Sequence, residues 1–279
     1  MFTCMIFTAL QLSAKHQKLN LQKAIDLKLV KARATSLGGH AGACMQMHLT
    51  NLGKDSLIVL IEAGRRLNSL DDKAQDILIV QQQVISLRKA EEKSFTVKGY
   101  CCQASKSAPK TNARYDVNKL ADSSLVKLAR YLSLNTFEQD VEQQAVWAIS
   151  DKQPAARITA KNDSLILPLR CFVADIKGEK LPWYTVVSRT YVYNNGAISV
   201  FPLLLKGKMQ YSADKDSYIT LTVLNEKGQQ VCLVQNQWFK AAKQADYQVN
   251  LPVKGLAKGK YSIELKTPEK QLAIQEFEL

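Results

Sequence analysis

The chain has 279 residues, of which 46% are hydrophobic and 23% are charged, with a formal net charge of +13. This composition is typical of a globular protein and excludes a largely disordered chain. No apolar run reaches the roughly 20 residues that a helix needs to cross a bilayer, so we expect no transmembrane span. The positive charge would attract polyanions. Because the basic residues are scattered and form no single stripe, specific nucleic-acid recognition is not expected.

The first 14 residues are apolar, and the basic residues Lys15 and Lys18 follow them closely. Ser13 and Ala14 are small residues of the kind found at a signal cleavage site. We therefore predict a signal segment over residues 1–14 and export to the periplasm, the cell surface or the medium. A buried N-terminal strand or helix is the alternative.

Residues 26–103 have the pattern of short strands separated by turns. Apolar and polar residues alternate with period two over residues 43–50 and again over residues 95–102, as in strands with one buried face. Several such strands at this spacing are typical of a sandwich. The sequence therefore predicts an immunoglobulin-like β-sandwich over residues 20–110.

After residue 115 the apolar residues follow the period of a helix, which predicts a helical segment over residues 111–181. Asp116 is expected to cap a first helix, and Thr136 with Gln139 forms the capping-box pair of a second. Gly178 is placed to end a third helix. The apolar residues expected to line the buried faces of the first and third helices are Val117, Leu120, Leu125, Leu128 and Leu132, and Leu165, Leu169, Phe172, Val173 and Ile176.

The last hundred residues return to strands and predict a second sandwich of about seven strands over residues 182–279. Asn194, Asn195 and Gly196 separate two β-compatible runs, and they predict a hairpin because Asn and Gly tolerate positive φ. The expected architecture is therefore mainly β, with two immunoglobulin-like β-sandwich domains separated by a short α-helical segment.

One stretch of this C-terminal region has a recognisable pattern. Residues 219–228, 249–251 and 255–265 include Gly255, Leu256, Gly259 and Tyr261 in a Gly-Leu-x-x-Gly-x-Tyr arrangement. The stretch resembles the C-terminal β-sandwich of Bacteroidota envelope proteins, of which the type IX secretion sorting domain is the best-known case. The resemblance implies an envelope-type sandwich.

The residues that usually carry catalysis or bind metal do not form a complete set. The three histidines are His16, His40 and His48, and neither a His-x-x-x-His nor a Cys-x-x-Cys spacing occurs. The serine-hydrolase elbow, the Walker loop and the dinucleotide fingerprint are missing too. We therefore expect a non-catalytic binding, adhesion or structural protein without metal or cofactor. Its partner is expected to be a surface ligand such as an acidic polysaccharide or a protein, and a polyanion- or carbohydrate-binding accessory role is a further alternative.

One constellation suggests specific chemistry. Tyr100 and Cys101 are followed some forty residues later by Gln143, Gln144 and Trp147. This pattern resembles the thioester domains of bacterial surface adhesins, although Glu142 stands where that family has Thr. The resemblance implies that the Cys101 thiol joins the Gln143 side chain, with Cys102 and Gln144 as alternates, and that the resulting thioester acylates a partner surface.

The cysteines that remain after the signal segment are Cys44, Cys101, Cys102, Cys171 and Cys232. Alternation over residues 95–102 places Cys101 on the apolar face, as a small core residue. Cys102 has the polar-face parity of Cys44, and the interval between them resembles that of the inter-strand bridge of immunoglobulin-like domains. The sequence leaves three states open: a thioester, a Cys44–Cys102 disulfide, and inert thiols.

Overall fold

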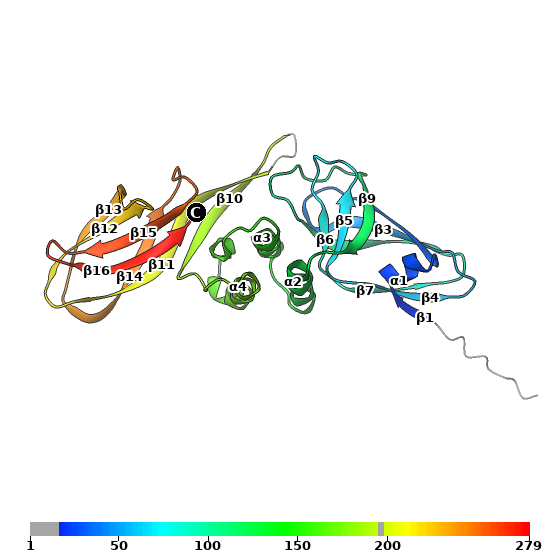
Figure 1. Ribbon diagram of the computed structural model, residues 1–279, viewed down its shortest axis with the longest axis horizontal. Helices are drawn as coiled ribbons and strands as arrows, with labels where there is room; N and C mark the ends of the chain where they lie inside the picture. Colours follow the sequence, from blue (N-terminus) through cyan, green and yellow to red (C-terminus); the bar gives the residue numbers. More distant parts are fainter. Residues whose placement is uncertain (1–16, 195–197) are drawn as a thin grey trace, which may run out of the picture.

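The computed structural model describes residues 17–194 and 198–279. The predicted signal segment and the centre of the predicted hairpin, Asn195 and Gly196, lie outside the described residues. The chain is mainly β. Along the long axis, a β-barrel region, a layer of helices and a pair of β-sheets follow one another (Figure 1).

The N-terminal region is a closed barrel with a small sheet and a short helix beside it. Around the barrel the strands follow the order β2-β3-β8-β6-β5-β9, and the small sheet has the order β1-β4-β7. The barrel strands are β2 (Val30–Ser36), β3 (Ala41–Asn51), β5 (Arg65–Ser69), β6 (Ile77–Ile79), β8 (Glu92–Cys101) and β9 (Arg114–Leu120). The remaining elements are β1 (Gln17–Asn20), α1 (Leu21–Asp26), β4 (Leu57–Ile61) and β7 (Gln83–Leu87).

The barrel core is built from alternate residues of its strands. Met45, Met47 and Leu49 of β3 are completely buried and belong to one cluster with Val97 of β8. This confirms the period-two alternation that the sequence predicts for these strands. Full burial of each such side chain contributes about 1.5–3 kcal/mol, so this alternation fixes which face of β3 turns inward.

Strand β9 closes the barrel, and the sequence predicted the start of a helix there. Tyr115 lies opposite Ala34 of β2, and Val117 lies opposite Leu67 of β5. The expectation that Asp116 caps a helix is therefore wrong. The predicted open sandwich over residues 20–110 is replaced by a closed barrel, because the strand that joins its two edges lies beyond residue 110.

The helical layer contains α2 (Ser123–Leu134), α3 (Gln139–Ser150), the 3-10 helix η1 (Ala155–Arg157) and α4 (Asp163–Lys177). The Asp122 carboxylate caps α2 by accepting hydrogen bonds from the backbone N–H groups of Ser124 and Leu125, both at 3.0 Å. Such a cap satisfies N–H groups that the helix itself leaves unpaired. Helix α2 therefore begins six residues after the position expected from the sequence.

The other two helices follow the sequence more closely. Helix α3 has Glu138 at its N-cap position, so the expected capping by Thr136 is wrong although the helix itself is present. Helix α4 ends at Gly178, which has a left-handed φ of 68° as predicted. On α4, Leu165 points outward and Ile166 occupies the core in its place.

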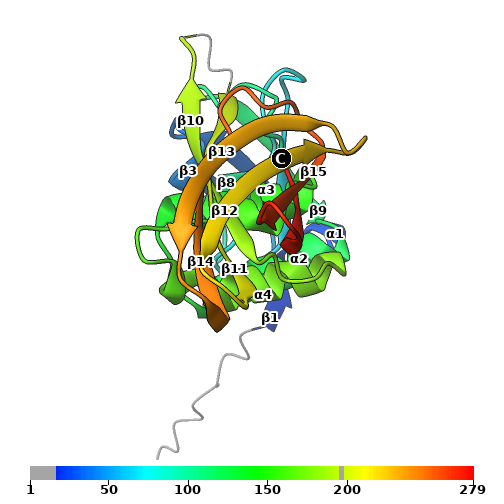
Figure 2. The ribbon, with the colours of Figure 1, turned by 90° about the vertical axis from the view of Figure 1, so that its left-hand side faces the viewer.

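The C-terminal region consists of two sheets around one core. One sheet has the order β10-β11-β14 and the other has the order β13-β12-β15-β16. Their bounds are β10 (Tyr184–Val192), β11 (Ile198–Ala213), β12 (Ser217–Asn225), β13 (Gln230–Phe239), β14 (Ala242–Pro252), β15 (Lys260–Lys266) and β16 (Gln271–Glu278). Val192 and Ile198 pair across the predicted hairpin. Ala156 of η1 belongs to the same core, which joins the helices to these sheets. In Figure 2 these sheets lie in front of the helices, with β12 and β13 curving across the view.

Gly64, between β4 and β5, is a point of close approach between the barrel and α2. Its φ is +95°, and a Cβ there would lie 2.9 Å from Cγ2 and 3.0 Å from Cα of Val126. Its N–H donates to the Ile79 carbonyl, and its carbonyl accepts from Ala121 N–H, both at 2.8 Å. The helical layer can lie this close to the barrel only because residue 64 has no side chain.

We predict that Gly64→Ala lowers the free energy of unfolding more than Gly39→Ala does. Both glycines have positive φ, but a Cβ at Gly39 would meet nothing within 4 Å. Backbone strain costs about 1–3 kcal/mol in both variants, and the contact with α2 adds roughly 1–3 kcal/mol in Gly64→Ala alone. Chemical denaturation measures the difference, and equal losses would show that residue 64 does not set the packing of α2.

Candidate functional site at the junction of strand β8 and helix α3

The end of strand β8 is buried on both faces. Val97 and Cys101 face the barrel core, whereas Tyr100 and Cys102 belong to the cluster formed with the helices. The alternation predicted from sequence is therefore confirmed, and Cys101 lies on the inward face as expected. The face predicted to be polar is covered at this end by the helical layer.

Gln143 of α3 bonds directly to the peptide groups of Cys101. Its Nε2 donates to the Cys101 carbonyl at 2.9 Å, and its Oε1 accepts from the Cys101 N–H at 3.1 Å. The same N–H also donates to the His40 carbonyl at 3.1 Å. Gln143 is 2% exposed and Cys101 is 0% exposed. The structure thus places the Gln143 side chain against the backbone of Cys101, whereas the Cys101 side chain belongs to the barrel core.

The alternates are placed differently. Gln144 Oε1 accepts from the Thr159 N–H at 2.7 Å, and this bond ties α3 to the segment before α4. The Cys102 thiol lies 3.9 Å from the Tyr100 carbonyl. Of the two glutamines, Gln143 is therefore the one whose side chain bonds to a cysteine residue, through the cysteine backbone.

The Cys44–Cys102 disulfide is not formed, and all five described cysteines are free thiols. Cys44 lies in the barrel core, with its thiol 3.5 Å from the Gly99 carbonyl, whereas Cys102 lies in the helical cluster. The wall of the barrel separates the two side chains. Cys44 and Cys102 have the same position in the alternation of polar and apolar residues. Because they lie on different strands, this did not place them on the same side of the sheet.

Burial keeps the thiols of Cys44, Cys101 and Cys102 protonated at neutral pH. It raises the pKa of Cys44 to about 11, that of Cys102 to about 12 against the opposing charge of Arg66, and that of Cys101 well above its ordinary value. A thiol in this state is a weak nucleophile towards an external reagent. A reaction of the Cys101 thiol must therefore depend on a group that the protein itself supplies.

A buried ion pair precedes Gln143 on the helix. Lys98 Nζ lies 2.8 Å from the Glu142 carboxylate, whose side chain is completely buried, while the Lys98 side chain is 31% exposed. Burial and the charge of Glu142 raise the pKa of the Tyr100 hydroxyl. The pair fastens α3 to β8 near the Cys101–Gln143 contact, because Glu142 directly precedes Gln143 and Lys98 lies three residues before Cys101.

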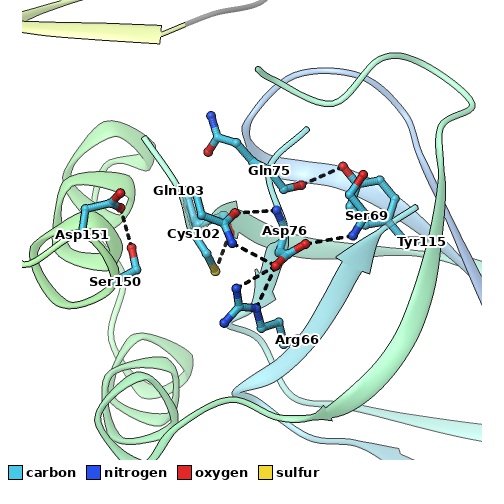
Figure 3. A network of polar contacts seen from close by, with 10 residues as sticks. Arg66, Ser69, Gln75, Asp76, Cys102, Gln103, Tyr115, Ser150 and Asp151 are labelled. Atoms are coloured by element: carbon cyan, nitrogen blue, oxygen red, sulfur yellow. Dashed lines mark hydrogen bonds and ion pairs between the residues drawn. The ribbon is translucent and has the colours of Figure 1, made fainter. Parts of the chain in front are cut away.

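A second polar network holds the chain that follows Cys101 (Figure 3). The Gln103 side chain accepts from the Asp76 N–H at 2.7 Å and donates to the Asp76 carboxylate at 2.9 Å. That carboxylate also accepts from Arg66 at 2.7 Å and from the Ser69 N–H at 2.9 Å. Burial alone would raise the pKa of Asp76, but these donors lower it below its ordinary value.

The same segment is also fastened to α3. The Asp151 carboxylate accepts from the Ala104 N–H at 3.0 Å and from the Ser150 hydroxyl at 2.8 Å (Figure 3). Beside this contact lies a cavity of about 580 Å³, with Arg66 and Cys102 on its wall. A cavity of this size can hold a small organic ligand. The barrel and α3 therefore both fix the end of β8.

The residues that hold this site together, Lys98, Glu142, Asp76 and Gln103, were not recognised in the sequence. In the sequence Glu142 stood out only as a departure from the adhesin pattern, although a charged residue on an otherwise apolar helix face is a signal that could have indicated a buried ion pair. Asp76 and Gln103 carry no recognisable motif. In residues 17–194 and 198–279 we find no cluster of three or more His, Cys, Asp or Glu side chains suited to a metal ion.

None of the helices in the described part of the chain combines the length and apolarity needed to cross a membrane. A search against family models found no match. Comparisons with curated proteins and with solved structures likewise found none.

We predict that Lys98→Met destabilises the fold by roughly 3 kcal/mol, because it leaves the buried Glu142 carboxylate without its cation. The matched control is Arg33→Met, which removes a pair with Glu92 whose side chains are 62% and 53% exposed. That loss should stay below about 1 kcal/mol. Chemical denaturation of both variants gives the comparison, and the addition of Glu142→Gln should recover part of the loss in Lys98→Met.

We also predict that Asp76 contributes to stability at neutral pH and that this contribution disappears in acid. Its pKa is lower in the folded protein than its ordinary value of 3.8. The stabilisation is therefore present above that value and is lost as the pH falls through the lowered pKa. Asp76→Asn should cost about 1–3 kcal/mol at pH 7 and should weaken the pH dependence of unfolding below pH 4. The exposed Asp72→Asn is the control, and identical acid profiles for the two variants would contradict the prediction.

Proposed function

We propose that the chain is an exported binding protein of the adhesion class, and that it binds covalently through an internal thioester between Cys101 and Gln143. The observation that carries this proposal is the pair of hydrogen bonds between the Gln143 carboxamide and the Cys101 peptide groups. The Gln143 side chain is 2% exposed, so these bonds replace the water that an exposed glutamine would bind. Here it is buried against the one cysteine that the adhesin pattern singles out.

The chemistry balances without an added reagent. The Cys101 sulfur attacks the Gln143 carboxamide carbon, the C–N bond breaks, and ammonia leaves with the proton that the thiol gives up. The product is an acyl thioester, which a nucleophile on a partner can open to form a covalent bond. The Cys101 peptide and the Gln143 carboxamide are in contact before any reaction starts, and the proposed step requires the thiol to turn from the barrel core towards the carboxamide carbon.

The remaining architecture supports a binding role. The two C-terminal sheets enclose one core and, we propose, form an immunoglobulin-like, envelope-type domain. The helical layer lies between the two β regions and carries Gln143 (Figure 1). Export rests on the apolar segment over residues 1–14.

The test is the intact mass of the purified protein under denaturing conditions. A thioester lowers the mass by one ammonia, about 17 Da, and methylamine should add to Gln143 and raise the mass to about 14 Da above that of the unreacted chain. Cys101→Ala and Gln143→Ala should each show the full mass, whereas Cys102→Ala and Gln144→Ala should keep the deficit. Peptide mapping locates the adduct.

A full mass for the wild-type protein, with free thiols at all its cysteines, would rule out the covalent function. The protein would then be a non-covalent binding module in which Gln143 is a structural clasp. A deficit that persists in Cys101→Ala would instead assign the reaction to another cysteine.

A further inference from the structure

The hairpin of β10 and β11 extends beyond the sheet to which it belongs. Strand β14 pairs with β11 only between Leu204 and Ala213, whereas β10 pairs with β11 as far as Val192 and Ile198. The hairpin end, defined as residues 189–193 and 198–201, is therefore a ribbon of two strands without a third strand beside it. Figures 1 and 2 both show the hairpin reaching towards the upper edge of the molecule.

One face of the hairpin end exposes aromatic side chains, whereas a residue on the other face is covered. Paired residues share a face, so Arg189 and Tyr191 lie on the same face as Phe201, the partner of Arg189. Tyr191 is 51% exposed and Phe201 is 48% exposed, whereas Ile198 on the opposite face is 6% exposed. A strand face that meets only water is normally polar. The aromatic face therefore suits contact with a partner other than water.

The far end of the ribbon is apolar on both faces. Tyr193 continues the aromatic face and is 43% exposed, and Val192 on the other face is 46% exposed. The rings of Tyr191 and Tyr193 lie edge to face, with their centroids 4.8 Å apart and an angle of 67° between their planes. Rings at this angle do not form the flat surface on which a sugar ring stacks. They form an apolar projection that carries two phenolic hydroxyl groups.

The charges of the hairpin all have the same sign. Residues 184–213 span both strands and their turn, and they include Arg189, Lys206 and Lys208 but no Asp or Glu. The whole chain carries a formal net charge of +13. A negatively charged surface would therefore attract the hairpin without opposing a carboxylate of its own strands.

The interface of an anionic membrane combines the chemistry that these side chains require. Tyrosine suits that interface because its ring is apolar and its hydroxyl group is polar. Segments that bind there bury their apolar side chains about 5–10 Å deep, and neighbouring basic residues are attracted to anionic headgroups. Tyr193 lies four residues beyond Arg189, which is about 13 Å along an extended strand. Burial of the ribbon end to this depth would therefore bring the Arg189 guanidinium to the headgroups.

We infer that the hairpin end binds an anionic lipid surface, with Tyr191 and Tyr193 in the interface and Arg189 at the headgroups. This binding goes beyond the proposed thioester, because it uses none of the residues around Cys101 and Gln143. It would bring the whole chain to a membrane surface without a membrane-spanning segment.

The experiment is co-sedimentation of the full chain with vesicles of phosphatidylcholine and phosphatidylglycerol in equal parts. Wild-type protein should bind these vesicles, should bind pure phosphatidylcholine far less, and should dissociate as added salt screens the attraction. The double variant Tyr191→Ser, Tyr193→Ser should bind on the order of 10-fold more weakly, because membrane binding follows the apolar area buried. Arg189→Gln should weaken binding about fivefold.

The matched control is the double variant Tyr218→Ser, Trp238→Ser. These two rings are 52% and 53% exposed and also lie edge to face, with centroids 5.0 Å apart, but they belong to β12 and β13. This control should bind the vesicles as the wild type does. Thermal unfolding of every variant shows that the comparison is made between folded proteins.

The inference is overturned if the wild type does not bind the anionic vesicles, or if the two double variants lose the same amount of binding. It is also overturned if the two hairpin tyrosines are needed for dimers without lipid or for retention on a soluble acidic polysaccharide, but not for vesicle binding. The partner would then be a second copy or a saccharide. Intact mass reports on the thioester separately, so either proposal can fail while the other stands.

Discussion

The bonds between the Gln143 carboxamide and the Cys101 peptide are the contact on which the site depends. A carboxamide carries an N–H donor and a carbonyl acceptor side by side, as a peptide group does. It can therefore form the hydrogen bonds that a strand backbone needs where no neighbouring strand continues. Because both residues are buried, water could not replace these bonds if the helix moved away. The contact therefore fixes α3 on the barrel at the backbone of Cys101, whose side chain belongs to the barrel core.

Other buried polar groups in this region serve the same contact. Glu142 is completely buried, and Lys98 balances its charge, since an isolated charge in such a place would be strongly destabilising. Asp76 and Asp151 hold the chain just after Cys101 from two sides, one from the barrel and one from α3. These contacts hold the end of β8, and with it the Cys101 peptide group, in a fixed position against α3.

The burial of Cys101 works against reaction of its thiol with external reagents. Thiols that react with external reagents usually have a lowered pKa and a positive neighbour, whereas burial raises the pKa of Cys101. Such a thiol is protected from oxidants and from random alkylation.

The sequence alone determined the features that depend on neighbours along the chain. Period-two alternation placed Met45, Met47 and Cys101 inward, and Gly178 ended α4, because side-chain direction in a strand and a left-handed helix end are local properties. Only the tertiary structure decided that β9 closes the barrel and that Gln143 meets Cys101. Strand pairing and the burial of a second strand face depend on residues far apart in the sequence, and their energies are decided by which surfaces the whole fold removes from water.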